Sequence, residues 1–270
     1  MSNPYQPIKA EIKKVIVETP QIKTFVLEPE KGLPFLSGQF MQVTVPGVGE
    51  CPFTPSSDPK NSETIEFTVM KTGQATGAMH ELKPGEMVGL RGPFGRPYPL
   101  PDFHGKDIYI IGGGVGIAPL RALLLALFHE LDQLNKIELR LGARSPDDLP
   151  FKKEMADWGK REKTSLVLTV DRGSESWTGK VGVVTGIMQP GDVKPDLAVA
   201  IVCGPPVMMK FATKKLLDLG IGDKNIYLSM EKNMSCGIGK CFHCNLGSHL
   251  CCKDGPVFTW EQVKEIPDPW

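Results

Sequence analysis

The cysteines near the C-terminal end have the spacing of a metal-cluster site. Seven cysteines occur in the chain, and they concentrate between positions 236 and 252. Their spacing, C-x4-C-x2-C followed by a later cysteine, is that of plant-type [2Fe–2S] ligands. Glycines at 237 and 239 let backbone N–H groups turn toward the cluster. The predicted ligands are Cys236, Cys241, Cys244 and Cys252.

Two other metal sites compete for these residues. A structural zinc site usually has two C-x2-C or C-x2-H pairs, and only Cys241/Cys244 forms one here, with His243 and His249 as possible further ligands. A Rieske centre replaces two cysteines by histidines on one iron, and four cysteines are available without them. The spacing favours [2Fe–2S]. A secreted disulfide scaffold normally spreads its cysteines along the chain.

A glycine run follows a short apolar strand at 107–111 and leads into a helical stretch. Glycine permits a sharp turn and close approach to a pyrophosphate, while the helix N-terminus offers unpaired N–H groups. A plain strand–helix turn would have the same local pattern, so context must decide. The predicted dinucleotide-binding residues are Gly112, Gly113, Gly114, Gly116, Ala118 and Pro119.

Further polar or glycine-containing segments follow later apolar strands. Arg144 and Ser145 could hold a ribose or its 2′-phosphate, although Arg144 could equally be a solvated loop residue. Asp171 ends the next strand, and the run Cys203, Gly204 and Pro205 ends another. Ligands of open α/β sheets bind at the edge formed by the carboxyl ends of the strands. These residues are therefore predicted to contact the dinucleotide.

The elements that must position these residues fall into two patterns. Strand-like segments at 8–29, 40–46 and 64–70, separated by Pro- and Gly-rich turns, predict an antiparallel barrel or sandwich. Beyond residue 102, apolar strands alternate with helices, which predicts a parallel sheet. The expected strands are 137–141, 166–170, 198–202 and 226–228, and the expected helices 119–134, 150–162 and 205–219.

Composition limits the remaining possibilities. The 270 residues include 31 Lys plus Arg and 31 Asp plus Glu, so the formal net charge is zero. The overall charge therefore does not indicate binding to nucleic acid or to an anionic membrane. No apolar run is long enough to span a bilayer, and we expect a cytoplasmic protein. We predict domains at 1–102, 103–230 and 231–270. The last is too short to bury a sufficient core alone, and a metal centre would stabilise it.

The whole sequence resembles the ferredoxin–NADP reductase superfamily, in the branch with a C-terminal [2Fe–2S] lobe. Within that branch it is most similar to gamma subunits of NAD(P)-linked nickel–iron hydrogenases, or sulfhydrogenases. Related members are the electron-transfer subunit of dihydroorotate dehydrogenase B and a subunit of anaerobic sulfite reductase. The resemblance rests on the segments 46–50 (PGVGE), 202–206 (VCGPP), 230–241 (MEKNMSCGIGKC) and 252–258 (CKDGPVF).

The resemblance implies an FAD-binding β-barrel, a Rossmann-like NAD(P) domain and a small cluster lobe. The flavin motif of many members, R-x-Y-S-x-x-S, is replaced here by CPFTPSS at 51–57, without the Arg and Tyr. The loop at 71–76 resembles the one near the flavin pyrophosphate, although Thr76 could also cap a helix over 77–82. Cys203 is implied near the nicotinamide–flavin contact, with a buried packing role as the alternative. The implied flavin contacts are Pro52, Phe53, Thr54, Ser56, Thr68, Val69, Gly73 and Thr76.

The function implied is electron transfer between NAD(P)H, FAD, the [2Fe–2S] cluster and a partner redox subunit of hydrogenase, sulfur reductase or heterodisulfide reductase type. No side chain is required as an acid or base, because the cofactors carry the chemistry. Two alternatives stand beside this expectation. One is the dihydroorotate dehydrogenase B electron-transfer subunit, and the other is a zinc-stabilised binding module that no longer holds flavin.

Overall fold

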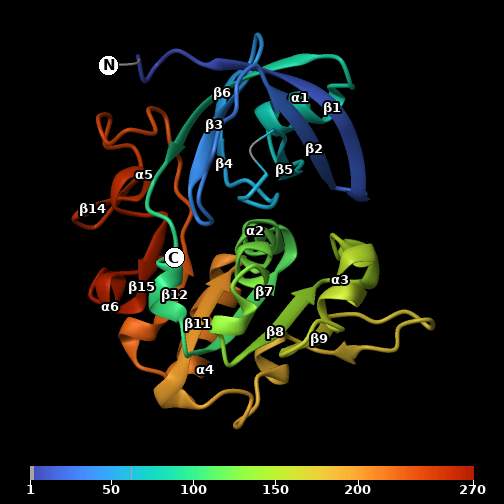
Figure 1. The fold of residues 1–270 in the computed structure, drawn as a ribbon, viewed down its shortest axis with the longest axis vertical. Helices are drawn as coiled ribbons and strands as arrows, with labels where there is room; N and C mark the ends of the chain where they lie inside the picture. The colour runs from blue at the N-terminus through green and yellow to red at the C-terminus, as the bar shows by residue number, and fades with distance from the viewer. Residues whose placement is uncertain (1–2, 62) are drawn as a thin grey trace.

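A computed structural model describes residues 3–61 and 63–270. A β-barrel lies above an α/β unit, and the C-terminal segment runs along one side of both (Figure 1). The six antiparallel strands of the barrel are ordered β4-β3-β6-β1-β2-β5. The barrel elements are β1 (Ile8–Thr19), β2 (Ile22–Pro29), β3 (Phe40–Val45), β4 (Gly49–Phe53), β5 (Ile65–Met70), α1 (Gln74–Glu81) and β6 (Met87–Phe94).

Alternating side chains close the barrel around an apolar core. In β2, Phe25 and Leu27 are fully buried, and Phe67 of β5 and Ile12 of β1 lie in the same cluster. Side chains at every second strand position share a face, so these residues pack inward. Ala122 of the second unit joins this cluster, which places the barrel core directly above a helix of the α/β unit.

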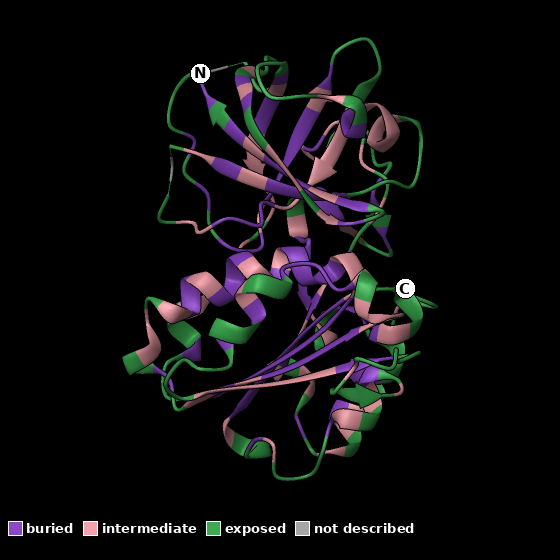
Figure 2. Ribbon diagram, turned by 90° about the vertical axis from the view of Figure 1, so that its right-hand side faces the viewer, coloured by how far each residue is buried: buried purple, intermediate pink, exposed green. Residues whose placement is uncertain are grey.

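The second unit is a seven-stranded sheet of order β10-β9-β8-β7-β11-β12-β15, in which only β15 is antiparallel. Its central strands are buried on both faces, as Figure 2 shows, and are therefore nearly continuous apolar runs. The strands are β7 (Asp107–Gly113), β8 (Lys136–Ala143), β9 (Thr164–Val170), β10 (Lys180–Val181), β11 (Ala198–Cys203), β12 (Ile226–Ser229) and β15 (Val257–Thr259).

Three helices accompany this sheet: α2 (Ile117–Phe128), α3 (Lys152–Trp158) and α4 (Pro206–Asp218). The predicted helix over 119–134 begins two residues earlier and ends at Phe128, because a 3-10 turn at Leu131–Gln133 replaces its last turn. The predicted helix over 150–162 is limited to α3, since Phe151 has a left-handed backbone that starts it. The four predicted strands are present, each with slightly different ends.

The C-terminal region contains β13 (Asn245–Leu246), β14 (His249–Leu250), α5 (Cys251–Asp254), β15 and α6 (Trp260–Val263). Strand β15 pairs with β12 and so becomes the edge strand of the α/β sheet. Cys244 and Cys252 share a buried cluster with Val202 and Leu228 of that sheet. This region therefore packs as a continuation of the second unit.

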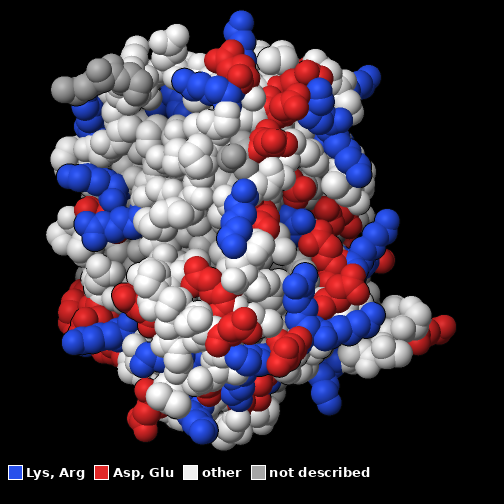
Figure 3. All heavy atoms as spheres, viewed as in Figure 1, with Lys and Arg blue, Asp and Glu red and all other residues white. Residues whose placement is uncertain are grey.

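The predicted fold class is confirmed: an antiparallel flavin-type barrel, a mostly parallel sheet and a small C-terminal region. Among the described residues, no helix is long and apolar enough to cross a membrane. Charges of both signs are spread over the face drawn in Figure 3, in keeping with the zero formal net charge.

Candidate cofactor sites

The four predicted cluster ligands lie in one loop region and form two pairs. The Cys236 sulfur accepts the Cys241 N–H at 3.4 Å, and the Cys244 sulfur accepts the Cys252 N–H at 3.4 Å. Cys241 is exposed, whereas Cys244 and Cys252 are buried. In the parts of the chain that the structure describes, no three His, Cys, Asp or Glu side chains gather as ligands for one ion. Two thiol pairs suit two irons better than one zinc ion.

Backbone N–H groups converge on the Cys236 sulfur. Those of Ile238, Lys240 and Cys241 lie 3.5, 3.3 and 3.4 Å from Sγ. Burial raises the pKa of the Cys236 thiol, but the N–H groups of Ile238, Cys241 and Lys240 outweigh it and bring the pKa to about 6. The loop therefore stabilises a thiolate, which is the form that binds iron.

The second pair is held differently. Cys252 Sγ accepts the Gly239 N–H at 3.1 Å, and Cys244 Sγ accepts the Cys252 N–H at 3.4 Å. Burial, followed by the hydrogen bond to the Cys244 thiol, raises the pKa of Cys252 to about 12. A bound metal deprotonates a coordinating thiol outright. Gly237 and Gly239 have φ of +73° and +75°, so only glycine adopts this cradle without strain.

Arg91 of β6 ties the cluster loop to the barrel. Its guanidinium is 4 % exposed and forms an ion pair with Glu50 of β4 at 2.5 Å. It also donates to the Cys236 carbonyl at 3.3 Å and to the Pro4 carbonyl at 2.9 Å. A Cβ on Gly237 would lie 3.1 Å from the Phe94 ring. The loop is thus seated directly on β6, an arrangement that the sequence reasoning missed.

The glycine loop joins β7 to α2 through a 3-10 turn at Gly114–Gly116. Gly116 is required by packing, since an added Cβ would lie 2.6 Å from the Gly204 backbone. Cβ atoms on Gly112 and Gly113 would instead meet the side-chain ends of Leu120 at 2.7 Å and Met208 at 2.4 Å. Gly114 differs, because it has φ of +57° and open space where its Cβ would be. Among the four glycines of this loop, only Gly114 has open space at its Cβ position. Ala118 is buried, and Pro119 lies in the first turn of α2.

The other predicted dinucleotide residues lie along the carboxyl edge of the sheet. Arg144 is exposed and Ser145 donates to Asp148 at 2.7 Å, so the Ser145 hydroxyl is already partnered. Asp171 is exposed, and its N–H donates to the Ala143 carbonyl. Burial raises the pKa of Cys203 to about 12, so this thiol is neutral. Gly204 and Pro205 follow it into α4.

Some of the predicted flavin residues are accessible, whereas others are buried or already hydrogen-bonded within the protein. Pro52, Phe53 and Thr54 are half-buried at the end of β4. The Ser56 and Thr68 hydroxyls are buried and lie 2.8 Å from each other, while Val69 is buried and its carbonyl contacts His80. Gly73 precedes α1, with open space at its Cβ position. Thr76 accepts the Thr72 and Gly73 N–H groups at 2.9 Å. Thr76 therefore caps a helix, which was the alternative to flavin binding, but it lies inside the first turn of α1 and not before the helix.

Family models match all three parts of the chain. The "Oxidoreductase FAD-binding domain" matches residues 8–98, and the "Oxidoreductase NAD-binding domain" matches 110–214. The "Iron-sulfur cluster binding domain of dihydroorotate dehydrogenase B" matches 231–264. The fold and sites thus define a nicotinamide- and flavin-binding oxidoreductase with an iron–sulfur domain. The zinc-stabilised module without flavin is therefore a wrong alternative.

Similar proteins cover nearly the full length. The chain is 35 % identical to sulfhydrogenase 1 subunit gamma of Pyrococcus furiosus, over 98 % of this chain and 94 % of that protein. It is 37 % identical to a probable dihydroorotate dehydrogenase B electron transfer subunit of Methanocaldococcus jannaschii, over 97 % and 93 %. An NADH-dependent reduced ferredoxin–NADP oxidoreductase structure aligns with TM-score 0.75 and 27 % identity, over 94 % and 89 %.

The chain belongs to the ferredoxin–NADP reductase superfamily, in the branch that carries a dihydroorotate dehydrogenase B-type iron–sulfur domain. Its cofactors are FAD, NAD(P) and a [2Fe–2S] cluster, and it is an electron-transfer flavoprotein whose relatives are subunits of multi-subunit complexes.

Proposed function

We propose that this chain is the NAD(P)H-linked electron-transfer subunit of a hydrogenase or sulfur reductase complex. When bound, the flavin exchanges a hydride with NAD(P)H and single electrons with the cluster. The chain's own residues bind and orient these groups. We assign Cys236, Cys241, Cys244 and Cys252 as the cluster ligands, and the loop around Gly114 as the dinucleotide phosphate site.

The seating of the cluster loop on the flavin barrel is the observation that carries this proposal. Arg91 joins barrel strand β6 to the carbonyl of Cys236, and Phe94 of the same strand lies beside Gly237. The flavin-binding barrel and the cluster loop are thus in direct contact. This arrangement suits a relay that leads electrons away from the flavin to another polypeptide.

A specific comparison favours a second candidate, the electron-transfer subunit of dihydroorotate dehydrogenase B. The relative with 37 % identity and the iron–sulfur family model both bear that name. We favour the hydrogenase or sulfur reductase complex because the segments 46–50, 202–206 and 230–241 most resemble those of gamma subunits, and two gamma-subunit relatives match nearly the whole chain. We also infer a cytoplasmic location, since the seven cysteines are unpaired and reducing compartments keep thiols free.

Anaerobic purification of the tagged chain from its native cells tests the assignment. We expect hydrogenase or sulfur reductase subunits to copurify; a dihydroorotate dehydrogenase catalytic subunit would instead establish the second candidate. The recombinant chain alone, loaded with FAD and cluster, should oxidise NAD(P)H with artificial dyes. Hydrogen evolution, sulfite reduction or dihydroorotate oxidation by that lone chain, at roughly 1–1000 per second, would contradict the subunit assignment.

A further inference from the structure

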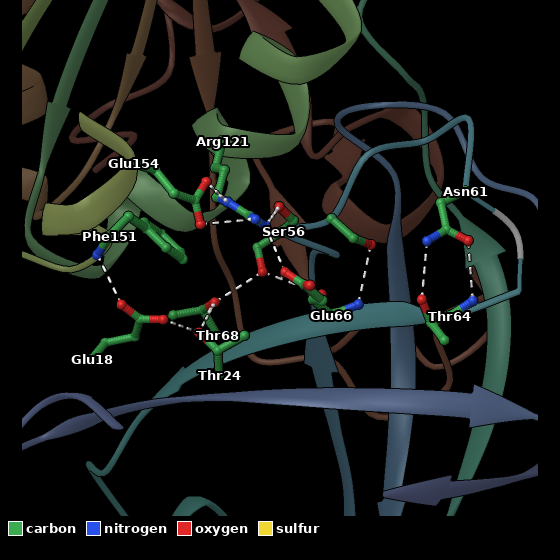
Figure 4. Close-up of polar contacts among 11 residues, drawn as sticks. Glu18, Thr24, Ser56, Asn61, Thr64, Glu66, Thr68, Arg121, Phe151 and Glu154 are labelled. Carbon is green, nitrogen blue, oxygen red and sulfur yellow. Dashed lines mark hydrogen bonds and ion pairs between the residues drawn. The ribbon is translucent and has the colours of Figure 1, made fainter. Parts of the chain in front are cut away.

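A chain of hydrogen bonds crosses the boundary between the barrel and the α/β unit at two places (Figure 4). The first crossing is Arg121 of α2, whose side chain is 12 % exposed. Its Nη1 donates to the Ser56 carbonyl and to the Glu66 carboxylate of β5, each at 2.6 Å. Its Nε and Nη2 donate to Glu154 of α3 at 2.8 and 3.0 Å. One guanidinium thus holds two elements of its own unit and two segments of the barrel.

The second crossing is Glu18 of β1. Its carboxylate accepts the Phe151 N–H at 2.9 Å and the Thr24 hydroxyl at 3.0 Å. Phe151 has φ of +56°, a backbone region that bulky residues rarely adopt, so the contact fixes a strained turn at the start of α3. The Arg121 guanidinium lies over the Phe151 ring, 5.0 Å from its centroid. Both crossings therefore meet at Phe151.

Buried hydroxyls connect the two crossings through the barrel. The Thr68 hydroxyl lies 2.8 Å from that of Thr24 and 2.8 Å from that of Ser56. All three side chains are buried. An apolar contact between two units tolerates sliding, whereas hydrogen bonds of this kind have fixed directions and are costly to break when buried. The network thus specifies one orientation of the α/β unit relative to the barrel.

The hydrogen-bond network lies between the predicted flavin site and the predicted dinucleotide site. Ser56 follows the half-buried Phe53 and Thr54 of the flavin stretch by a few residues. Arg121 lies one turn into the helix that the glycine loop begins. The guanidinium therefore joins the backbone beside one predicted cofactor site to the helix that carries the other.

We propose that Arg121 and its partners Ser56, Glu66 and Glu154 form a device that aligns the nicotinamide with the flavin by fixing the orientation of the two units. This inference rests on the proposed function. The step it serves moves one hydride, two electrons with one proton, from the reduced nicotinamide to the flavin, so that NAD(P)H is oxidised and the flavin reduced. Arg121 is a positioning residue in this step, because it acts through the backbone of Ser56 and through α2.

The test compares full-length, cofactor-loaded variants by stopped-flow reduction of the flavin. Arg121→Met should slow reduction at saturating NAD(P)H by about 10- to 100-fold, the loss expected from small misplacements of reacting groups. The nucleotide dissociation constant, flavin content and iron content should stay within about threefold, because Arg121 itself binds neither cofactor. The charge-transfer absorbance between flavin and nicotinamide should weaken in parallel. Arg121→Lys should recover only part of the rate, since lysine lacks the planar fork.

Arg161→Met is the matched control. Arg161 also lies over an aromatic ring, 4.6 Å from the Phe128 centroid, but this contact lies entirely within the α/β unit. It should leave the reduction rate unchanged. An unchanged rate in Arg121→Met would overturn the proposal, and so would a slower rate fully accounted for by weaker nucleotide binding. If Arg121→Met does not fold, Arg121→Lys and Glu154→Gln are judged by the same two criteria.

Amide hydrogen exchange separates this proposal from the proposed function. If NAD(P)H fails to reduce even the wild-type flavin, the proposed function is wrong. The orientation device is then judged on exchange alone: faster exchange of the Phe151 amide and of β5 in Arg121→Met, but not in Arg161→Met, supports it. Equal exchange in both variants overturns it.

Discussion

Cys251 and Cys252 are neighbours in the sequence, yet their sulfurs have different surroundings. Cys251 is fully buried and its Sγ donates to the Met230 carbonyl at 3.6 Å. Cys252 Sγ instead receives the Gly239 N–H within the cluster loop. We expect Cys252→Ser to lose or strongly perturb the cluster and Cys251→Ser to retain it, as measured by iron, acid-labile sulfide and the cluster spectrum. Loss in Cys251→Ser with an unchanged Cys252→Ser would reverse the ligand assignment.

The buried guanidinium of Arg91 leads to a prediction about cluster retention. Arg91→Met takes the guanidinium from the Glu50 carboxylate, which keeps only the Thr44 hydroxyl as a donor, and from the Cys236 carbonyl. Loss of one partner of a buried ion pair costs about 3 kcal/mol. We therefore expect lower stability to urea and faster release of iron to a chelator. Lys13→Met is the control, because Lys13 pairs with Glu11 and Glu28 in exposed positions; iron release as slow in Arg91→Met as in Lys13→Met would contradict the role of Arg91.

Spacing in the sequence predicted the residues of the candidate site that lie near one another in the chain, but not those whose partners are distant in sequence. The four ligand cysteines lie close together in sequence, so their spacing alone indicated a cluster. Arg91 could not be found in this way, because Glu50 and Cys236 lie 41 and 145 residues away from it. Arg121 likewise contacts Ser56 across 65 residues. Such pairs depend on the packing of units, which no local pattern contains.

At the scale of elements, the turn between β7 and α2 leads to a prediction about nucleotide binding. Any residue other than glycine at Gly114 adds a side chain to open space, and φ of +57° adds strain for most of them. Asn tolerates this backbone better than other residues, so Gly114→Asn tests intrusion with less strain than Gly114→Val. We expect weaker NAD(P)H binding, by about tenfold (1.4 kcal/mol), with normal FAD and iron contents, measured by titration calorimetry.

Gly105→Asn provides the control for this variant. Gly105 also has a left-handed backbone, with φ of +72°, and open space at its Cβ position, but it precedes β7 at the opposite end of the strand. The same substitution there should leave nucleotide affinity unchanged. Equal affinities of Gly114→Asn and the wild type would show that the loop is only a structural turn.

The segment after the 3-10 turn Val184–Ile187 is fastened to the sheet by Asp192. Its carboxylate pairs with Arg140 of β8 at 2.7 Å and accepts the Tyr109 hydroxyl of β7 at 2.5 Å. Burial alone would raise the pKa of Asp192. The hydrogen bonds from Arg140, Tyr109 and the Gln189 N–H have the opposite and larger effect, so the pKa of Asp192 lies below its usual value. A lowered pKa in the folded state stabilises the protein above the unfolded value, near 3.9, and this stability is lost as pH falls toward the folded pKa.

Asp192→Asn should therefore flatten the acid limb of the stability profile. At neutral pH the variant should lose about 2 kcal/mol, the contribution of a hydrogen bond to a charged group, because Arg140 loses the Asp192 carboxylate but keeps its ion pair with Glu138. As pH falls below about 4, through the lowered folded pKa, the difference from the wild type should shrink, because the wild-type carboxylate becomes protonated. Urea unfolding at a series of pH values measures this, and a constant difference across that range would contradict the prediction.

The sequence patterns predicted which helices and strands form more reliably than they predicted where each one begins and ends. The apolar runs of β8, β9, β11 and β12 are short and bounded by turns and helical segments, which is the pattern of buried strands in a parallel sheet. The three-residue strand β15 was not predicted, because its pairing with β12 comes from the cluster region folding back against the sheet. The left-handed backbone of Phe151, which starts α3, is likewise fixed by a partner in β1 rather than by its neighbours.

At the scale of the whole molecule, sequence patterns separated three regions but did not show how they join. The boundaries at 102/103 and 230/231 remain predictions. Arg91, Arg121 and β15 provide contacts between the regions, and each links residues far apart in the chain. Composition shifts indicate where one type of structure ends. They contain no information on which surfaces then meet.

The shared core of the cluster region and the α/β sheet makes iron removal a test of the whole assembly. Cys244 and Cys252 pack in one buried cluster with Leu228 of β12 and Phe258 of β15. Metal binding is coupled to folding where the apo ligands are not held in place otherwise. Anaerobic chelation of the iron should therefore speed amide exchange in β12 and β15, while β1 and β2 of the barrel stay protected. Protein incubated with iron-saturated chelator is the control, and unchanged exchange at β12 after complete iron loss would show that the sheet edge is stable without the cluster.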